Sequence, residues 1–129
     1  MKNSTARDMA DVLANVSGVG SFGTNIFVSR EPAKPDNCIT LYDTGGFQTD
    51  VNTDYQRPTI QVRCRNTAYS TGWDIMEHVK LILNGLNGVT TTGFRYIGVW
   101  LMSDIAHIGY DESNRALFTM NFRIHRTAV

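Results

Sequence analysis

The sequence predicts an α+β fold in which two helices pack against a mostly antiparallel sheet, forming a single domain over residues 1–129. Two apolar stripes with helical spacing lie near the N-terminus and in mid-chain, and strand-like alternation dominates the C-terminal third. A chain of this length is sufficient for one hydrophobic core. No internal repeat, linker or low-complexity tract divides it.

The first expected helix begins after Ser4 or Thr5, either of which suits an N-cap. Asp8 then lies in the first turn, where a negative charge favours the helix dipole. One apolar stripe has the spacing i, i+3, i+4, i+7: Met9, Val12, Leu13 and Val16. Gly18 and Gly20 are expected to end the helix.

Two strands are expected next, over residues 26–28 and 38–42, separated by a proline-containing turn region. Asp, Thr and two glycines at residues 43–46 predict a turn that ends the second strand. Residues 47–57 are polar and predict an extended loop or a mobile arm.

Clean alternation over residues 59–66 predicts a strand with one buried and one charged face. The inward set is Ile60, Val62 and Cys64, and the outward set is Gln61, Arg63 and Arg65. We therefore expect both arginines to lie on a free face of the sheet. Cys38 and Cys64 form no CxxC pattern and are interpreted as buried free thiols.

A second helix is expected from a cap at Ser70 or Thr71 to about Asn84, with Asp74 in its first turn and Gly85 as its end. Its wide apolar stripe suits packing on a sheet. The stripe consists of Ile75, Met76, Val79, Ile82, Leu83 and Leu86.

The C-terminal third is predicted to be β-rich. Residues 94–102 are apolar on both alternating faces, which predicts a central strand covered on both sides, and residues 105–110 predict another short strand. Residues 116–126 alternate with Ala116, Phe118, Met120, Phe122 and Ile124 inward. Four aromatic residues are expected in the core: Trp73, Phe94, Tyr96 and Trp100.

One motif suggests catalysis. Asp43-Thr44-Gly45 resembles the catalytic loop of retroviral-type aspartic proteases, and residues 106–109 imitate their later glycine segment. These proteases have a helix after that segment, whereas residues 116–126 have strand periodicity. Asp-Thr-Gly is also an ordinary turn sequence. We therefore expect Asp43 to be structural, and the protease remains a minor alternative.

Other constellations predict no metal or cofactor site. His78, His107 and His125 lack metal-ligand spacing and lie on separate elements. The glycines at 18, 20 and 23 give G-x-G-x-x-G, but the order of helix and strand around them is the reverse of a dinucleotide site.

The composition argues against nucleic acid and membranes as partners. Twelve Lys and Arg balance twelve Asp and Glu, so the basic excess typical of sequence-independent nucleic-acid binding is absent. No apolar run approaches the roughly 20 residues of a membrane span, and no signal-peptide core opens the chain. We expect the protein to be made and folded in cytoplasm.

Three segments together resemble the tail terminator and minor capsid proteins of long-tailed bacteriophages. They are residues 39–46, residues 57–65 with their Arg-x-Arg strand, and residues 110–126. A short N-terminal helix and an aromatic-bearing helix after the Arg-x-Arg strand, here with Tyr69 and Trp73, complete the likeness.

This resemblance implies a non-enzymatic virion protein that forms a ring, usually a hexamer, on the last tail-tube subunits at the head-proximal end of the tail. Such a ring ends tube polymerisation and presents a surface to the connector or stopper proteins of the head. Head-completion and stopper proteins of the same neck have similar size and remain the alternative. A ring needs a head-to-tail interface in which one patch meets a different patch. The expected pairs join Arg63 and Arg65 to carboxylates of a neighbour, drawn from Asp50, Asp54, Asp111 and Glu112.

Overall fold

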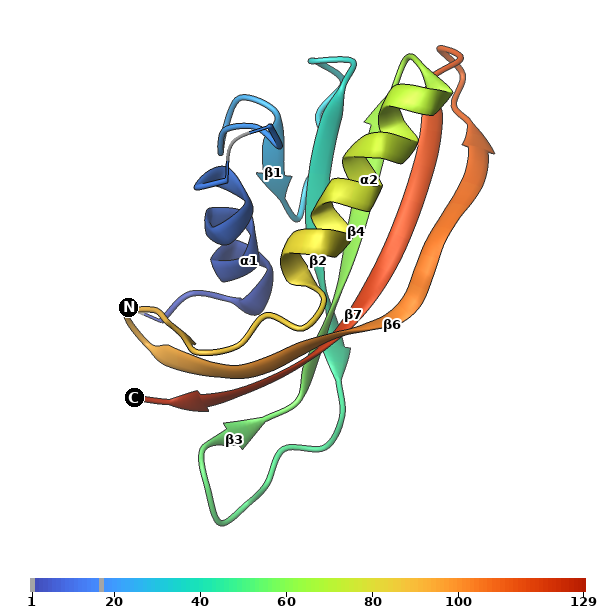
Figure 1. Cartoon of the computed structure of the whole chain (residues 1–129). Helices are drawn as coiled ribbons and strands as arrows, with labels where there is room; N and C mark the ends of the chain where they lie inside the picture. Colours follow the sequence, from blue (N-terminus) through green and yellow to red (C-terminus); the bar gives the residue numbers. More distant parts are fainter. Residues whose placement is uncertain (1, 17) are drawn as a thin grey trace.

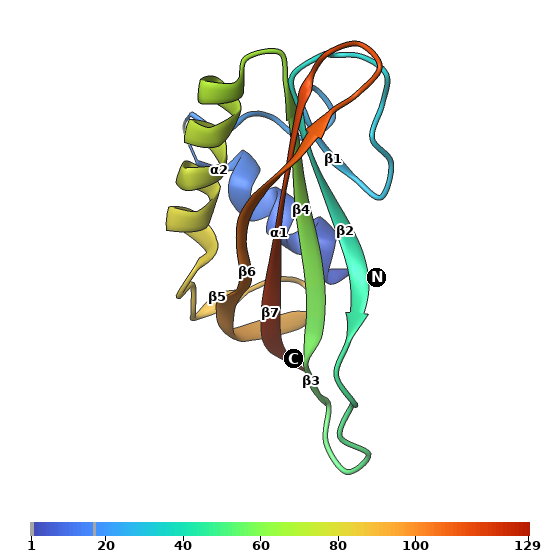
Figure 2. The same ribbon diagram turned by 90° about the vertical axis from the view of Figure 1, so that its right-hand side faces the viewer.

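The computed structural model describes residues 2–16 and 18–129, and it has the predicted α+β architecture. Two helices lie on one face of a curled, mostly antiparallel sheet (Figures 1 and 2). The helices are α1 (Thr5–Ala14) and α2 (Tyr69–Leu83). The strands are β1 (Ile26–Val28), β2 (Cys38–Gly46), β3 (Tyr55–Gln56), β4 (Pro58–Asn66), β5 (Val89–Thr90), β6 (Phe94–Tyr110) and β7 (Ala116–Ala128).

The strand order along the sheet is β1-β2-β4-β7-β6-β5, with β3 also pairing with β7. Among the strands of the described residues, β1 and β2 pair in parallel and every other neighbouring pair is antiparallel. Because β7 lies in the middle, its inward side chains form the centre of the core. All five predicted inward residues of β7 are fully buried, which confirms the alternation of that segment.

The helix nearest the N-terminus begins as predicted but ends at Ala14, with Asn15 as its C-cap, so the expected extension through Val16 to a stop at Gly18 and Gly20 is wrong. The Ser4 hydroxyl accepts the Arg7 amide at 3.2 Å and caps α1. Met9 and Leu13 are fully buried against the sheet, with Val12 packed at the margin of the core. None of the described helices has the length and apolar character needed to cross a membrane.

Helix α2 begins at Tyr69, two or three residues earlier than expected. Its N-cap is Ala68, which has no side-chain capping bond, so the prediction of a Ser70 or Thr71 cap is wrong and Asp74 lies beyond the first turn. The helix start is set instead by Asn66, whose side-chain oxygen accepts the Ala68 amide at 3.0 Å. Its end is as expected, because Gly85 adopts a positive φ of 86° directly after Asn84.

Strand β2 does not end at Tyr42, so the predicted turn at residues 43–46 is wrong. The strand continues to Gly46, and a register shift between Asp43 and Gly46 accommodates the glycines. Gly46 has a φ of 130°, and a Cβ there would lie 2.4 Å from the Arg57 carbonyl oxygen. The glycine therefore permits a bulge with close strand approach.

Strand β6 is also different from its prediction. It is one long strand from Phe94 to Tyr110, and its outer face is open, with Ile97, Trp100 and Met102 exposed. The prediction of coverage on both faces, and of a core position for Trp100, is wrong. Bulges shift the register along β6, so apolar residues on successive positions do not mean two buried faces.

Candidate functional site

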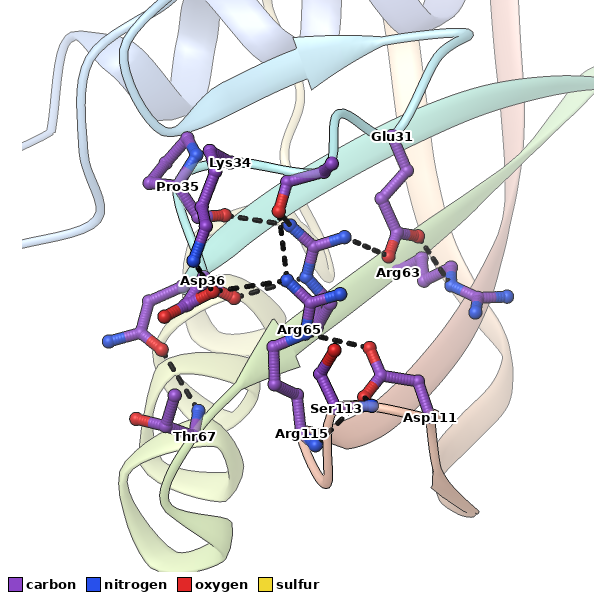
Figure 3. Close-up of polar contacts among 12 residues, drawn as sticks. Glu31, Lys34, Pro35, Asp36, Arg63, Arg65, Thr67, Asp111, Ser113 and Arg115 are labelled. Atoms are coloured by element: carbon purple, nitrogen blue, oxygen red, sulfur yellow. Dashed lines mark hydrogen bonds and ion pairs between the residues drawn. The ribbon is translucent and has the colours of Figure 1, made fainter.

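Arg65 lies at the centre of a polar cluster on the outer face of the sheet (Figure 3). Its side chain is only 4% exposed, because residues 29–37 fold across the strand that carries it. The guanidinium donates to Glu31 Oε1 at 3.0 Å and to the carbonyls of Pro35, Asp36 and Ala33 at 2.7, 3.1 and 3.4 Å. Every nitrogen of Arg65 is therefore bonded within its own chain.

Arg63 shares the same carboxylate. Its Nε lies 2.6 Å from Glu31 Oε2, and its side chain is 30% exposed. The expectation that Arg63 and Arg65 lie together on a free, solvated face is therefore wrong for Arg65 and holds only partly for Arg63. The physical reason is that strand alternation assigns a face but does not show which loop covers it.

Asp111 is also held within its own chain. Its Oδ2 accepts Arg115 Nε at 2.7 Å, and its Oδ1 accepts the backbone amides of Arg115 and Ser113 at 2.9 and 3.0 Å. These bonds, led by the backbone amide of Arg115, lower the pKa of Asp111 below its usual range. Arg115 in turn reaches Asp36 at 3.2 Å, which ties this turn to the loop over Arg65 (Figure 3).

The other acidic candidates project away from the body. Residues 47–54, here called the arm, leave the sheet between β2 and β3 and extend beyond its end (Figures 1 and 2). Asp50 and Asp54 are exposed on the arm, and the 90% exposed Val51 stands between them. Asp50 accepts only the Asn52 amide, at 3.0 Å. Within the described chain, neither carboxylate, nor that of the exposed Glu112, forms an ion pair.

The structure assembles a second polar surface that the sequence did not predict, here called the aromatic–arginine patch. It consists of Tyr55, Arg57, Trp100, Arg123 and His125. The Tyr55 hydroxyl is hydrogen bonded to His125 Nδ1 at 2.7 Å, and the His125 ring meets the Trp100 ring edge-on at 4.8 Å. The guanidiniums of Arg123 and Arg57 lie over the rings of Trp100 and Tyr55, at 5.4 and 5.0 Å from their centroids.

The patch is electropositive. Partial burial lowers the pKa of His125, and the charges of Arg123 and Arg57 lower it further. The sequence gives one indication of this patch: Arg123 and His125 alternate with the inward residues of the segment 116–126 and so fall on its outer face. Their neighbours depend on cross-strand register, which sets Trp100 opposite Arg123 and Tyr55 opposite Thr127.

Asp43 has the structural role that was predicted, with a different partner. Its Oδ1 accepts the Ala6 amide at 2.9 Å, so it satisfies a free N–H of the first turn of α1. Asp43 is exposed, but it lies within strand β2, opposite Ile60, and not in a loop. This arrangement does not favour the protease alternative.

Asp8 has a role that the sequence did not predict. It was expected only to favour the helix dipole, but it is buried and holds a hydrogen-bond network. Asp8 is 2% exposed, and Oδ2 accepts the hydroxyls of Tyr96 and Thr91 at 2.5 and 3.1 Å. Asn3 donates to Oδ1 at 3.3 Å. Burial and the bond to Asp8 raise the pKa of Tyr96. The network joins α1 to β6, and Arg126 extends it to β7 through the Tyr96 hydroxyl at 3.2 Å.

Thiols and histidines do not assemble a site. Cys38 and Cys64 are free and buried, as interpreted, and burial raises the pKa of Cys64 to about 12. His107 packs against Tyr69 and Phe118. Among residues 2–16 and 18–129, no three His, Cys, Asp or Glu side chains lie so that they could hold a metal ion.

Comparison with known proteins gives matches of two kinds, to a family and to solved structures. Residues 15–128 match the model of a family described as bacteriophage tail terminator protein. One solved chain, from a structure described as the virion of a native gene transfer agent particle, superposes with a TM-score of 0.67. That alignment covers 98% of this chain and 100% of the other at 14% sequence identity, so it shows a shared fold. No curated protein sequence matches the chain.

Proposed function

The chain belongs to the bacteriophage tail terminator family, and from that premise we propose that it forms a ring that caps the tail tube. The ring is a homohexamer at the head-proximal end of the tail. It ends polymerisation of the tube and provides the surface that joins tail to head. Its partners are further copies of itself, the tail tube protein and a connector or stopper protein of the head, and it assembles in the host cytoplasm.

The observation that carries this proposal is the family match over nearly the whole chain, residues 15–128. A structural role is also supported by the acidic side chains of the described residues, because several of them bond to groups of their own chain. Asp43 and Asp8 are bonded to structural partners, and Glu31 is shared by two arginines. A domain of residues 1–129 with these groups engaged suits a building block of a particle.

A free edge of the sheet also supports assembly. Strand β5 pairs with β6 only at Arg95 and Tyr96, and the segment after α2 bonds to Val99. Beyond it, no strand of the described chain pairs with the outer edge of residues 102–110. Met102, Ile108 and Tyr110 are about half exposed there. Long apolar edges are templates for contact with another chain, so this edge suits an assembling subunit.

Among the predicted interface residues, Asp50, Asp54 and Glu112 remain proposed contacts between subunits. Arg65 and Asp111 are bonded within their own chain and contribute by supporting the surface, and Arg63 contributes through its exposed part. Native mass spectrometry of the purified protein, alone and with tail tube, tests the ring directly. The proposal expects a six-subunit species seen as a ring in negative-stain images. A protein that stays monomeric even on tail tubes contradicts it.

A further inference from the structure

The aromatic side chains of the aromatic–arginine patch support one another within the subunit. The Trp100 ring lies against Gly98, where an added Cβ would stand 2.5 Å from the ring. His125 supports it from the side, and Tyr55 fixes His125 through the 2.7 Å hydrogen bond. Trp100 nevertheless remains 38% exposed. Fixed, partly exposed Trp, Tyr and Arg side chains are the residue types that dominate binding energy in protein interfaces.

The patch carries positive charge that its own chain does not neutralise. Arg57 and Arg123, together with the nearby exposed Arg95, form no ion pair within the described residues. The Arg57 guanidinium donates to the Gln48 carbonyl at 3.2 Å. Register places Arg95 beside this surface, because Arg95 and Tyr55 both pair with Thr127. Three guanidiniums therefore face outward at one end of the sheet.

The complementary charge is on the same molecule. The chain has twelve acidic and twelve basic residues, so an excess of one sign at one surface requires the opposite excess elsewhere. The arm supplies it with Asp50 and Asp54, and the exposed Val51 between them offers an apolar contact for an aromatic ring. Arg57 touches the arm at Gln48, but within the described residues neither Asp50 nor Asp54 forms an ion pair with a patch arginine. Complementary charges that remain unpaired on one chain suit a head-to-tail interface between copies.

We propose that the aromatic–arginine patch of one subunit receives the arm of the next subunit in the ring, an inference that rests on the proposed ring function. Arg123 and Arg95 pair with Asp50 and Asp54 of the neighbour, and Val51 packs against Trp100. The occupant is a second copy of this chain and not DNA, because the patch arginines are few and are matched by free carboxylates of the chain itself.

Two charge-reversed variants test the pairing. The patch variant is Arg95→Glu with Arg123→Glu, and the arm variant is Asp50→Arg with Asp54→Arg. Each alone should weaken subunit association by at least about 100-fold, because close interfacial charge pairs couple strongly. An equimolar mixture should recover rings in which the two variants alternate. Arg7→Glu with Arg30→Glu, at exposed positions outside the patch and the arm, is the control with a matched change of charge.

The measurement is native mass spectrometry at physiological salt, and circular dichroism confirms that each variant is folded. If the wild-type protein alone is monomeric, the same measurement is made with tail tube added. Recovery of rings by the mixture alone supports the proposal. Normal rings from either single variant overturn it while leaving the ring function intact. Wild-type protein that forms no ring under either condition contradicts the proposed function itself. Duplex DNA bound by the wild type and lost in the patch variant, with rings unchanged, overturns the proposal and assigns the patch to nucleic acid.

Discussion

Replacement of Arg65 by alanine is predicted to destabilise the folded subunit, whereas the same change at Arg63 leaves stability nearly unchanged. Arg65 is 4% exposed and forms four hydrogen bonds with its own chain, one of them to Glu31. Removing one partner of a buried ion pair costs about 3–5 kcal/mol. Glu31 and the loop carbonyls lie near enough to the surface to regain water, so the lower value, about 3 kcal/mol, is expected for Arg65→Ala.

Arg63 provides the matched control on the same strand and the same carboxylate. Its side chain is 30% exposed and makes one ion pair, so Arg63→Ala should cost less than about 1 kcal/mol. The assay is urea unfolding followed by circular dichroism, at a dilution where the protein is monomeric so that association does not add stability. With a slope of about 2 kcal/mol/M, the midpoint of Arg65→Ala should fall by about 1.5 M. Equal midpoint shifts for the two variants would show that the loop does not bury Arg65 in solution.

Three further predictions concern the other polar groups. Asp43→Asn should keep fold and assembly, because its amide oxygen still accepts the Ala6 amide. Asp43→Ala should lower the free energy of unfolding in urea by about 0.5–2 kcal/mol. Acid-dependent peptide hydrolysis that Asp43→Asn abolishes would overturn this structural role. Tyr96→Phe should lower the free energy of unfolding by about 1–3 kcal/mol, because the buried Asp8 loses its shortest hydrogen bond; an unchanged thermal midpoint would contradict that. The arm, residues 47–54, should exchange amide hydrogens rapidly in the free subunit and slowly in assembled tails. Strong protection in both states would refute an arm that orders on a partner.

Local patterns in the sequence were sufficient where the feature depends on neighbours along the chain. Ser4 caps α1 as expected, and the alternation of β7 gave its buried face without error. The apolar stripe of α2 likewise identified Met76 and Val79 as buried. In these segments, periodicity and burial have the same cause, because one face of the element packs on the core.

Features that depend on pairing with distant segments could not be predicted from local periodicity. Asp43 to Gly46 has the composition of a turn, yet pairing with β4 keeps the segment in the sheet through a bulge. In β6, bulges break the two-residue period, so Trp100 was assigned to the core although it faces outward. Composition gives no indication of such register shifts.

The candidate site shows the same limit more clearly. Alternation placed Arg65 on the outer face correctly, but only the fold of residues 29–37 buries it against Glu31. The aromatic–arginine patch joins Tyr55, Trp100 and His125 from three strands, and their proximity is set by cross-strand register. These side chains are far apart in the sequence and form no motif or periodic pattern, so the sequence alone did not indicate that they form one patch.

The length of tails assembled without this protein tests the central proposal most directly. A subunit that caps the tube should, when its gene is deleted, leave overlong tubes of irregular length that do not join heads, as measured by negative-stain electron microscopy. Supplying the wild-type protein during assembly should restore a uniform length and joined particles. Tails of uniform, normal length that merely fail to join heads would contradict termination and assign the protein to another position in the neck.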